Sequence, residues 1–192
     1  MLKHFSSSKS LHAYIIGLAL GDGNLSNPNG RATRLRITCD KKYPQLITEV
    51  QASLTKLLPS NKVSVINRTN CVDISCYSNH FENLLRWKVS LGSKFRQKVR
   101  VPDWIKAKNI YIKECLRGLL QTDGSIYLDR GYTMVNFVSC IPTLAMDVIS
   151  MMNQLGYKPN IQKFTSSNLD KYTIRISRRS TEFINEINLW KK

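Results

Sequence analysis

Two nine-residue segments of the chain end in the same Asp-Gly pair. They read IIGLALGDG at residues 15–23 and LRGLLQTDG at residues 116–124, so each is a helical, largely apolar run with Gly at its third position. The acids that precede the final glycines, Asp22 and Asp123, are 101 residues apart. Long internal self-similarity normally reflects duplicated structural units that pack against one another. The repeat therefore predicts a fold built from two similar halves.

The similarity continues beyond these motifs. At the offset of 101, the residues Gly23, Leu25, Thr38 and Cys39 match Gly124, Ile126, Ser139 and Cys140. At an offset of 102, the residues Ile74, Ser75, Phe81 and Asn83 match Ile176, Ser177, Phe183 and Asn185. A register held over some sixty residues is hard to obtain by chance.

Hydrophobic periodicity and turn residues predict the same order of elements in each half. In the first half we expect a helix at 11–21 capped by Ser10, strands that include 34–39, a helix from Pro44 to the break at Pro59, strands at 62–67 and 71–77, and a helix at 79–89. In the second half we expect a helix at 112–122, strands at 125–128 and 133–139, a helix at 143–155, strands at 160–164 and 172–177, and a helix from Ser180.

These elements give an α+β fold with a domain division at 1–90, 91–110 and 111–192. The middle segment is basic and contains Trp104 and Ile105, so we expect it to pack against the body of the protein rather than act as a free linker.

Small residues mark one face of each motif helix. Gly17 and Gly21 are four residues apart, as are Gly118 and Thr122, so each pair shares a helical face. A glycine inside a helix costs about 1 kcal/mol relative to alanine, which suggests a specific reason for it. We expect Gly17 and Gly118 to allow a close contact between the two helices around a pseudo-twofold axis.

The two motif acids are poorly placed for stability. Asp22 and Asp123 fall at helix C-termini, where the helix dipole repels an anion, and the helix pairing would bring them together. A hard divalent cation such as Mg²⁺ would relieve this repulsion. Two acids beside a basic strand surface indicate metal-assisted hydrolysis of a phosphodiester. The alternative, that each Asp-Gly merely ends a helix, accounts poorly for two copies in register.

The charge indicates a polyanionic partner. The chain has 29 basic and 13 acidic side chains, a net charge of +16, and the basic residues are spread from Arg31 to Lys192. This distribution is typical of a nucleic-acid-binding surface rather than of a merely soluble one. No apolar run approaches the roughly 20 residues of a membrane span. A peripheral membrane protein would need an amphipathic basic helix, which we do not find.

The N-terminal sequence does not resemble a signal peptide, and the cysteines and histidines form no zinc-binding spacing. We expect reduced, mostly buried cysteines and an intracellular location, in a bacterial or archaeal cytoplasm or an organelle.

With its two motifs, each followed by matching strands, the chain resembles the LAGLIDADG homing endonuclease family in its monomeric two-motif form. The string KFRQKVRVPDWI at residues 94–105 is similar to the segment that often precedes the second motif of that family. The resemblance implies two αββαββα halves whose antiparallel sheets form a saddle on a long DNA duplex. It also implies Mg²⁺-dependent cutting of both strands with 3′ overhangs, two or three bound ions, and replacement of Mg²⁺ by Mn²⁺.

The resemblance further implies site residues. Asp22 and Asp123 would bind the metal ions, with the backbone carbonyls of Gly21 and Thr122 as secondary ligands. A pocket lysine would polarise the attacking water. Lys98 is the first choice for this role and Lys94 the second. The alternative is that these lysines only contact phosphates.

A further pocket residue is expected after the second strand, at Asp40 or Lys41. The chain departs from the family motif at Leu20 and Gln121, where an acid is common. The second half has no full counterpart of residues 94–102, which predicts two unequal sites.

The polar faces of the strands are the expected DNA contacts, through base edges or phosphates. In the first half the candidates are Asn24, Ser26, Arg31, Arg34, Arg36, Thr38, Asp40, Lys62, Ser64, Asn67, Arg68, Asn70, Asp73, Ser75 and Tyr77. In the second half they are Ser125, Tyr127, Arg130, Tyr132, Asn136, Gln162, Lys163, Arg175 and Ser177.

Two rival functions use the same fold. One is a maturase that binds the RNA of its host intron, and the other is a DNA-binding regulator that does not cleave. The presence of both Asp22 and Asp123 favours a nuclease. Both halves lie in one chain, which predicts a monomer.

Overall fold

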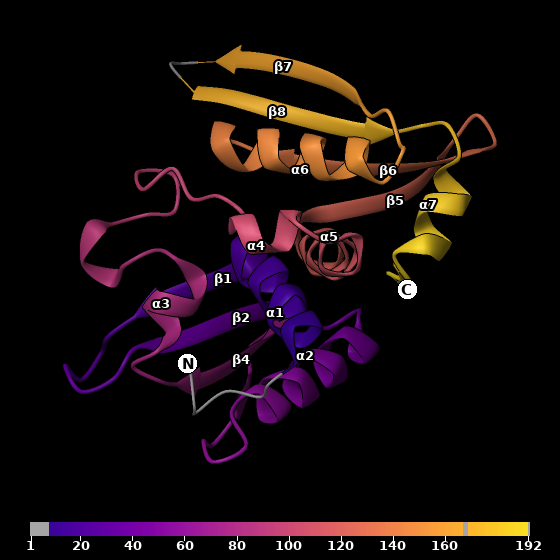
Figure 1. Ribbon diagram of the computed structural model, residues 1–192. Helices are drawn as coiled ribbons and strands as arrows, with labels where there is room; N and C mark the ends of the chain where they lie inside the picture. The colour runs from indigo at the N-terminus through magenta and orange to yellow at the C-terminus, as the bar shows by residue number, and fades with distance from the viewer. Residues whose placement is uncertain (1–7, 167–168, 192) are drawn as a thin grey trace.

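The computed structural model describes residues 8–166 and 169–191 and shows two similar halves around a central pair of helices (Figure 1). The first half contains α1 (Lys9–Asp22), β1 (Gly23–Ser26), β2 (Arg34–Asp40), α2 (Pro44–Leu57), β3 (Ser64–Asn67), β4 (Cys71–Tyr77) and α3 (Phe81–Leu85). The second contains α5 (Asn109–Asp123), β5 (Gly124–Asp129), β6 (Tyr132–Ser139), α6 (Pro142–Gln154), β7 (Asn160–Ser166), β8 (Leu169–Ile176) and α7 (Ser180–Glu186). The connecting segment contributes η1 (Val89–Leu91) and α4 (Asp103–Lys106).

Each half carries one antiparallel four-stranded sheet, and the two sheets have the same topology. Their strand orders are β1-β2-β4-β3 and β5-β6-β8-β7. The predicted α+β fold of paired αββαββα halves is therefore confirmed. Whether the halves fold independently, as the division at residues 90 and 110 implies, stays a prediction.

Alternation along the strands divides each sheet into a core face and a polar face. Leu35, Ile37 and Cys39 of β2 are buried, whereas the alternate residues Arg34 and Arg36 are half-exposed. This is the pattern expected for a sheet with one face on the core and one toward solvent. Helices α2 and α6 cover the core faces, so the polar faces are left open (Figure 1).

Helices α1 and α5 pack so closely at two glycines that no side chain fits between them. A Cβ atom at Gly17 would lie 2.2 Å from the carbonyl oxygen of Cys115. A Cβ at Gly118 would lie 2.4 Å from the carbonyl oxygen of Tyr14. The contact predicted from the spacing of the small residues is thus present, and it is a contact between backbones.

A buried polar network fixes the alignment of these helices. The Tyr14 hydroxyl donates a 2.7 Å hydrogen bond to Gln121, and Gln121 donates to Glu49 of α2 at 3.2 Å. Arg117 forms an ion pair with Glu49, and its guanidinium lies 3.8 Å from the centre of the Tyr14 ring. Because the partners come from α1, α2 and α5, sliding one helix past another would break several bonds at once.

The connecting segment is held against the second half. Val101 and Ile105 are buried, and the backbone N–H of Val101 donates to the carboxylate of Asp147 on α6 at 2.8 Å. Lys106 pairs with the same carboxylate at 2.9 Å, and Trp104 packs edge-on against Tyr111. The expectation that this segment packs against the body is confirmed.

Two predicted helix boundaries were wrong. Helix α1 begins at Lys9 rather than residue 11, because the hydroxyl of Ser8 rather than of Ser10 accepts the N–H of Leu11. The helix expected at 79–89 ends at Leu85, where Arg86 adopts a left-handed conformation with φ 65°.

The repeat register from sequence was also wrong in part. Gly23 pairs with Ile37 and Gly124 with Phe137, so these partners correspond at an offset of 100. Ile37 pairs with Ile74 and Phe137 with Ile174, which makes Ile174 rather than Ile176 the counterpart of Ile74. The first connection of the second half is one residue shorter, and sequence matching alone did not locate that deletion.

None of the helices within the described residues is long and apolar enough to cross a membrane. The five cysteines are free thiols, and Cys39, Cys76 and Cys115 are buried.

Replacement of Gly17 or Gly118 by alanine should lower the free energy of unfolding by about 1–3 kcal/mol or more, because the added methyl group overlaps a fixed backbone carbonyl. Urea unfolding monitored by circular dichroism measures the loss. Gln51→Ala on the exposed side of α2 is the matched control and should change stability little. Equal stability of the glycine variants and the control would contradict the close helix contact.

Candidate active site

The carboxyl groups of Asp22 and Asp123 meet where α1 and α5 end. Each helix passes directly into a strand at the following glycine. A Cβ at Gly23 would lie 2.4 Å from the carbonyl oxygen of Ala19, and one at Gly124 equally close to that of Leu120. The glycine of each Asp-Gly pair is thus required, because the strand begins directly against the last turn of its own helix. As predicted, the two acids lie side by side, with Asp123 donating a hydrogen bond to Asp22.

The proximity of the two acids perturbs their ionisation. Both side chains reach solvent, but the surrounding protein replaces much of their hydration. This desolvation, together with the neighbouring charge of Asp22, raises the pKa of Asp123 to about 6. Desolvation also raises the pKa of Asp22, against the lowering effect of Lys94 and Lys191. Two like charges sharing one site behave in this way when no cation separates them.

Lys94 reaches the first end of this site from the connecting segment. Its ammonium donates hydrogen bonds to the carbonyl oxygens of Ala19 at 3.2 Å and Leu20 at 2.8 Å, and to that of Gly21. These are the last carbonyls of α1, so Lys94 neutralises the negative end of the helix. Burial lowers the pKa of Lys94, while Asp123 and Asp22 oppose that change.

Lys191 is the counterpart of Lys94 at the end of α5, and sequence reasoning missed it. Its ammonium donates to the carbonyl oxygen of Thr122 at 2.9 Å and to that of Gly124. Burial lowers the pKa of Lys191, and Asp22 and Asp123 again raise it. The second half therefore supplies its lysine from a different segment, so each end of the acidic pair has one ammonium group although residues 94–102 have no full counterpart.

The donor set fits a hard divalent cation. It consists of the carboxylates of Asp22 and Asp123 and the carbonyls of Gly21 and Thr122, all oxygen atoms. Within residues 8–166 and 169–191, no cluster of three or more His, Cys, Asp or Glu side chains forms a closed metal site. An ion held here would keep positions for water or substrate phosphate, as Mg²⁺ usually does.

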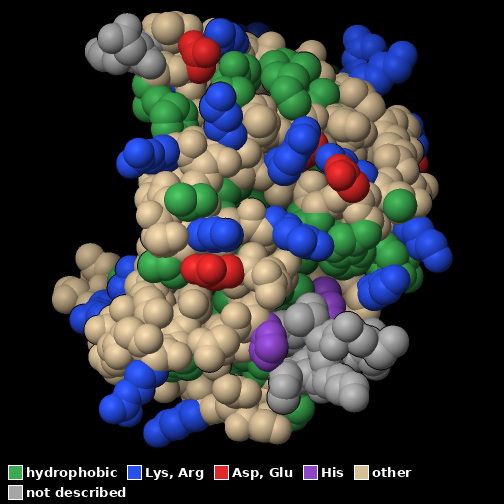
Figure 2. Space-filling model, turned by 60° about the vertical axis from the view of Figure 1, so that its left-hand side comes forward, with side chains coloured by type: hydrophobic (Ala, Val, Ile, Leu, Met, Phe, Trp, Pro, Cys, Tyr) green, Lys and Arg blue, Asp and Glu red, His purple; other side chains and the backbone are tan. Residues whose placement is uncertain are grey.

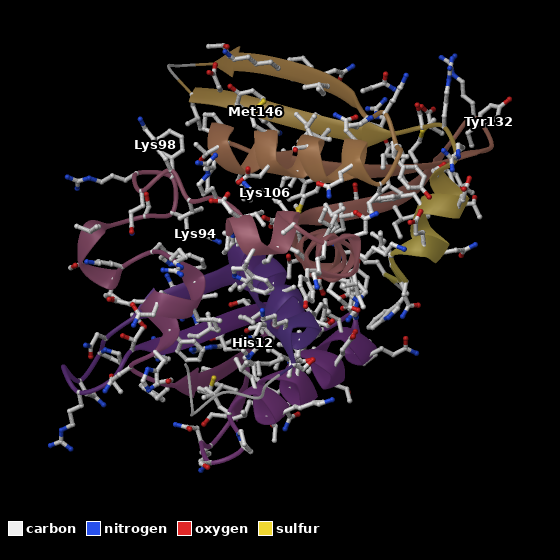
Figure 3. All side chains as sticks on the ribbon, viewed as in Figure 1. His12, Lys94, Lys98, Lys106, Tyr132 and Met146 are labelled. Carbon is white, nitrogen blue, oxygen red and sulfur yellow. The ribbon has the colours of Figure 1, made fainter. Side chains whose placement is uncertain are left out.

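The other predicted pocket residues lie at different distances from this centre. Lys98, the first-choice lysine, lies in a separate cavity of about 460 Å³ between Arg86 and Trp104, so the geometry favours Lys94. Figure 3 shows Lys94 beside the central helices and Lys98 farther out on the connecting segment. Asp40 is ion-paired with Lys42 at 3.0 Å and interacts with Lys191. The side chain of Lys41 is exposed.

The polar face of the first sheet is rich in charge. The residues that share it are Asn24, Ser26, Arg34, Arg36, Thr38, Ser64, Asp73, Ser75 and Tyr77, according to the strand register. Asp73 is buried beneath this face. It accepts hydrogen bonds from Thr38 at 2.8 Å and Arg68 at 3.0 Å, and lies 3.9 Å from Arg36. Asp73 therefore holds Arg68 and Arg36 in place and is too buried to contact DNA directly.

Other first-half candidates lie away from that face. Asn67 of β3 alternates with Ser64 and Ile66, so it projects toward the opposite side of the sheet. Arg31, Lys62 and Asn70 are exposed in the loops and turns that flank the strands.

The polar face of the second sheet carries Asp129, Lys171 and Arg175 among neutral polar and apolar side chains. Ser125, Tyr127, Tyr132, Asn136, Gln162 and Arg175 share it. Arg175 donates to Asn136 at 3.1 Å, and Asn136 donates to Tyr127 at 3.2 Å. Ser177 follows β8 at the end of this face, and Arg130 lies at the tip of the β5–β6 turn with φ 51°.

Lys163 does not belong to this face. It is adjacent to Gln162 in β7, so the two side chains project to opposite sides of the sheet. Lys163 pairs with Asp170 at 2.9 Å and lies over the Tyr172 ring on the core side. Its assignment to the DNA-binding face was therefore wrong.

Basic side chains extend over both halves of the molecule rather than forming one patch. Figure 2 shows Lys and Arg scattered from the top to the bottom of one face, with few Asp or Glu among them. This agrees with the net charge of +16 and with an extended polyanionic ligand.

The comparisons with known proteins agree with this architecture. A model of the LAGLIDADG-like domain family matches residues 111–188. The crystal structure of I-DmoI in complex with DNA and Mn superposes with a TM-score of 0.69 at 17% identity, over 93% of this chain and 96% of that one. The N-terminal LAGLIDADG domain of DUF199/WhiA superposes with a TM-score of 0.62 at 14% identity, over 97% and 86% of the two chains.

A curated relative matches part of the sequence. The tRNA-splicing ligase RtcB of Methanopyrus kandleri is 30% identical over 139 residues, which make up 63% of this chain and 14% of that protein. The chain thus spans only a small part of the curated relative that it matches. The solved structures superpose on nearly all of the chain. Because their sequence identity is low, this similarity establishes the fold alone. Residues 111–188 thus match the LAGLIDADG-like domain family, and the chain as a whole has the two-domain fold seen in I-DmoI.

Proposed function

We propose that the protein is a site-specific endonuclease that hydrolyses both strands of a DNA duplex in a divalent-metal-dependent reaction. The observation that supports this most strongly is the paired carboxyl group at the meeting point of α1 and α5. This pair lies between two sheets whose polar faces are open. Structures of I-DmoI in complex with DNA together with Mn or Ca are consistent with such a site.

The chain supplies two similar sets of groups at the site, one for each DNA strand. Asp22, Asp123 and the carbonyls of Gly21 and Thr122 would hold Mg²⁺, which when bound would acidify a water molecule and stabilise charge on the phosphate. Lys94 and Lys191 bring ammonium groups to the two ends of the carboxyl pair. Once these ammonium groups leave the carbonyls that ligate the metal, an N–H of each would be available to donate to a phosphate oxygen as negative charge develops on it.

The sheets would position the DNA for this reaction. A duplex lying across both polar faces would meet Arg34 and Arg36 in one half and Asn136 and Arg175 in the other. Arginine pairs with guanine and asparagine with adenine, each good bidentate pair giving about 1–3 kcal/mol of discrimination. The two polar faces carry different side chains, which predicts an asymmetric target. Cutting with 3′ overhangs, two or three ions and a monomeric enzyme belong to the same proposal.

The second candidate is a DNA-binding protein of this fold that does not cleave. The ammonium groups of Lys94 and Lys191 contact the same two carbonyls that would ligate the metal, so cleavage requires these lysines to yield to the ion. A role in binding intron RNA stays a prediction.

Asp22→Asn and Asp123→Asn should each reduce Mg²⁺-dependent cleavage by at least about a hundredfold, because each removes a charged ligand from the shared site. The substrate is a randomised duplex library, with cut sites read by sequencing. Asp103→Asn, on an acid that is 93% exposed on α4, is the matched control and should cut normally. Sequence-specific duplex binding without any metal-dependent cutting by the wild type would identify the non-cleaving candidate instead.

Lys94→Met should slow cleavage at least about tenfold while DNA affinity in Ca²⁺ changes little, because its ammonium lies at the carboxyl pair. Lys98→Met is the matched control from the same segment, since its side chain lies in the separate cavity. Single-turnover rates measure the difference. A larger loss with Lys98→Met than with Lys94→Met would restore the assignment made from the sequence.

The stability of the metal-free protein should respond to pH through Asp123. Its pKa is raised from 3.8 to about 6 on folding, so its contribution is fully present below pH 4 and is lost as the pH rises through 6. Relative to the wild type, Asp123→Asn should therefore gain stability as the pH rises from about 4 to about 7, with little further change above that. Urea unfolding in a chelator tests this, and a difference that stays constant with pH would contradict it.

A further inference from the structure

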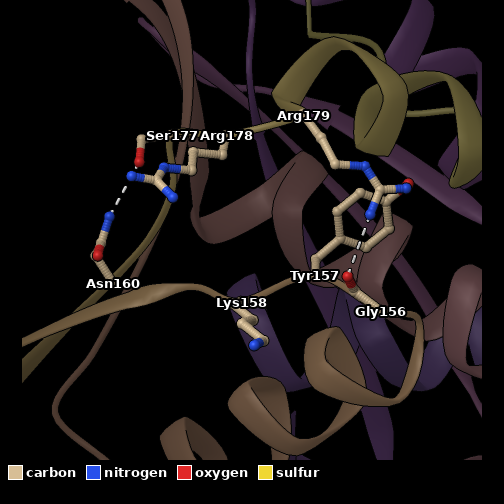
Figure 4. A pocket seen from close by; sticks show the side chains of 7 residues that line it. All are labelled: Gly156, Tyr157, Lys158, Asn160, Ser177, Arg178 and Arg179. Carbon is tan, nitrogen blue, oxygen red and sulfur yellow. Dashed lines mark hydrogen bonds between the residues drawn. The ribbon is translucent and has the colours of Figure 1, made fainter.

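A cavity of about 640 Å³ lies at the outer end of the second sheet, where β8 ends and β7 begins. Its lining comes from the loop before β7 and the loop between β8 and α7 (Figure 4). It lies at the far end of the sheet from the Asp22–Asp123 pair, because β5 runs outward from Gly124, β6 returns beside it, and β8 runs outward again to Ile176.

In one wall of this cavity, the charged side chains are held in ion pairs with one another. Arg179 forms an ion pair with Glu182 at 2.5 Å, and its guanidinium lies 5.0 Å from the centre of the Tyr157 ring. The hydroxyl of Tyr157 donates to Glu186 at 2.5 Å, and Glu186 also pairs with Lys113. Both nearby acids are therefore engaged, so neither neutralises the rest of the cavity.

The remaining charge in the cavity is positive. Lys158 and Arg178 are exposed, and neither forms an ion pair with any residue that the structure describes. In Figure 4 the guanidinium of Arg178 lies toward Asn160 and Ser177. Asn160 donates to the Ser177 hydroxyl at 3.0 Å, which holds two more hydrogen-bonding groups at the rim. Two unpaired cations beside neutral polar groups suit an anion with several oxygens.

The corresponding end of the first sheet lacks this charge. A cavity of about 290 Å³ there is lined by Ala32, Asn61, Tyr77, Ser78, Asn79 and His80, with no Lys or Arg among them. The second half also has ten residues from Ile174 through the buried Phe183, against eight from Ile74 through Phe81. Arg178 and Arg179 lie in this longer segment. The fold can therefore be completed without these cations, and they need another explanation.

The cavity continues the polar face of the second sheet. Asn160 pairs in register with Arg175, which donates to Asn136 of the same face. A ligand that lies along this face and extends past its outer end would reach Lys158 and Arg178. We propose that this cavity is a clamp for a backbone phosphate of the DNA duplex, at the flank of the target and independent of base sequence. The inference rests on the proposed function, because the duplex must lie on the sheets.

The test is the salt dependence of binding by the full chain to a random-sequence duplex in Ca²⁺, measured by fluorescence anisotropy. Each phosphate contact contributes about 0.9 to the slope of log affinity against log salt. Because the clamp holds one phosphate, the double variant Lys158→Gln, Arg178→Gln should lower the slope by about 0.9, and each single variant by less. Lys56→Gln, an exposed lysine of α2 behind the first sheet, removes one charge elsewhere and should leave the slope unchanged.

An unchanged slope in the double variant, with wild-type DNA binding intact, would overturn the clamp alone. An equal fall in Lys56→Gln would also overturn it, because the effect would then be general charge rather than a site. A slope change seen with structured RNA and not with duplex DNA would assign the cavity to another ligand. Failure of the wild type to bind duplex at all would instead refute the proposed function. Thermal unfolding of each variant confirms that the fold is intact.

Discussion

The structure depends on the direct contact of two helix backbones at Gly17 and Gly118. Because no side chain separates α1 from α5, their C-terminal ends also meet, and Asp22 and Asp123 are brought within hydrogen-bonding distance. Gly21 extends the contact, since a Cβ there would lie 2.0 Å from the Thr122 hydroxyl. The two sheets then diverge from this point, so one helix contact places both the reactive groups and the two polar faces.

This arrangement favours function over stability. Two carboxyl groups share one site at the negative ends of two helices, which raises the pKa of both. Lys94 and Lys191 offset the repulsion by donating to the terminal carbonyls, but burial lowers their own pKa values. A site that stores unfavourable electrostatics of this kind is ready to bind a cation.

Sequence patterns correctly predicted the features that depend on neighbouring residues. Periodicity and turn residues identified the helices and strands, and the repeated Asp-Gly identified the acidic pair. The predictions that failed concern residues whose position depends on the tertiary structure. Lys191 is distant in sequence from the motif whose carbonyl it contacts, and nothing near Thr122 points to it. Lys94 and Lys98 are equally basic, and only the path of the connecting segment separates them. Gln162 and Lys163 are adjacent in β7, so only one of them can face the DNA-binding side of the sheet, and the ion pair with Asp170 identifies Lys163 as the other.

The central claim is that Asp22 and Asp123 jointly hold divalent metal where the DNA backbone crosses the helix ends. Anomalous diffraction from crystals of the protein with a duplex and Mn²⁺ tests it most directly. We predict at least one anomalous peak within ligand distance, about 2–2.5 Å, of carboxylate oxygens from both acids. A structure with duplex bound across the sheets and no metal between these two residues would contradict the account.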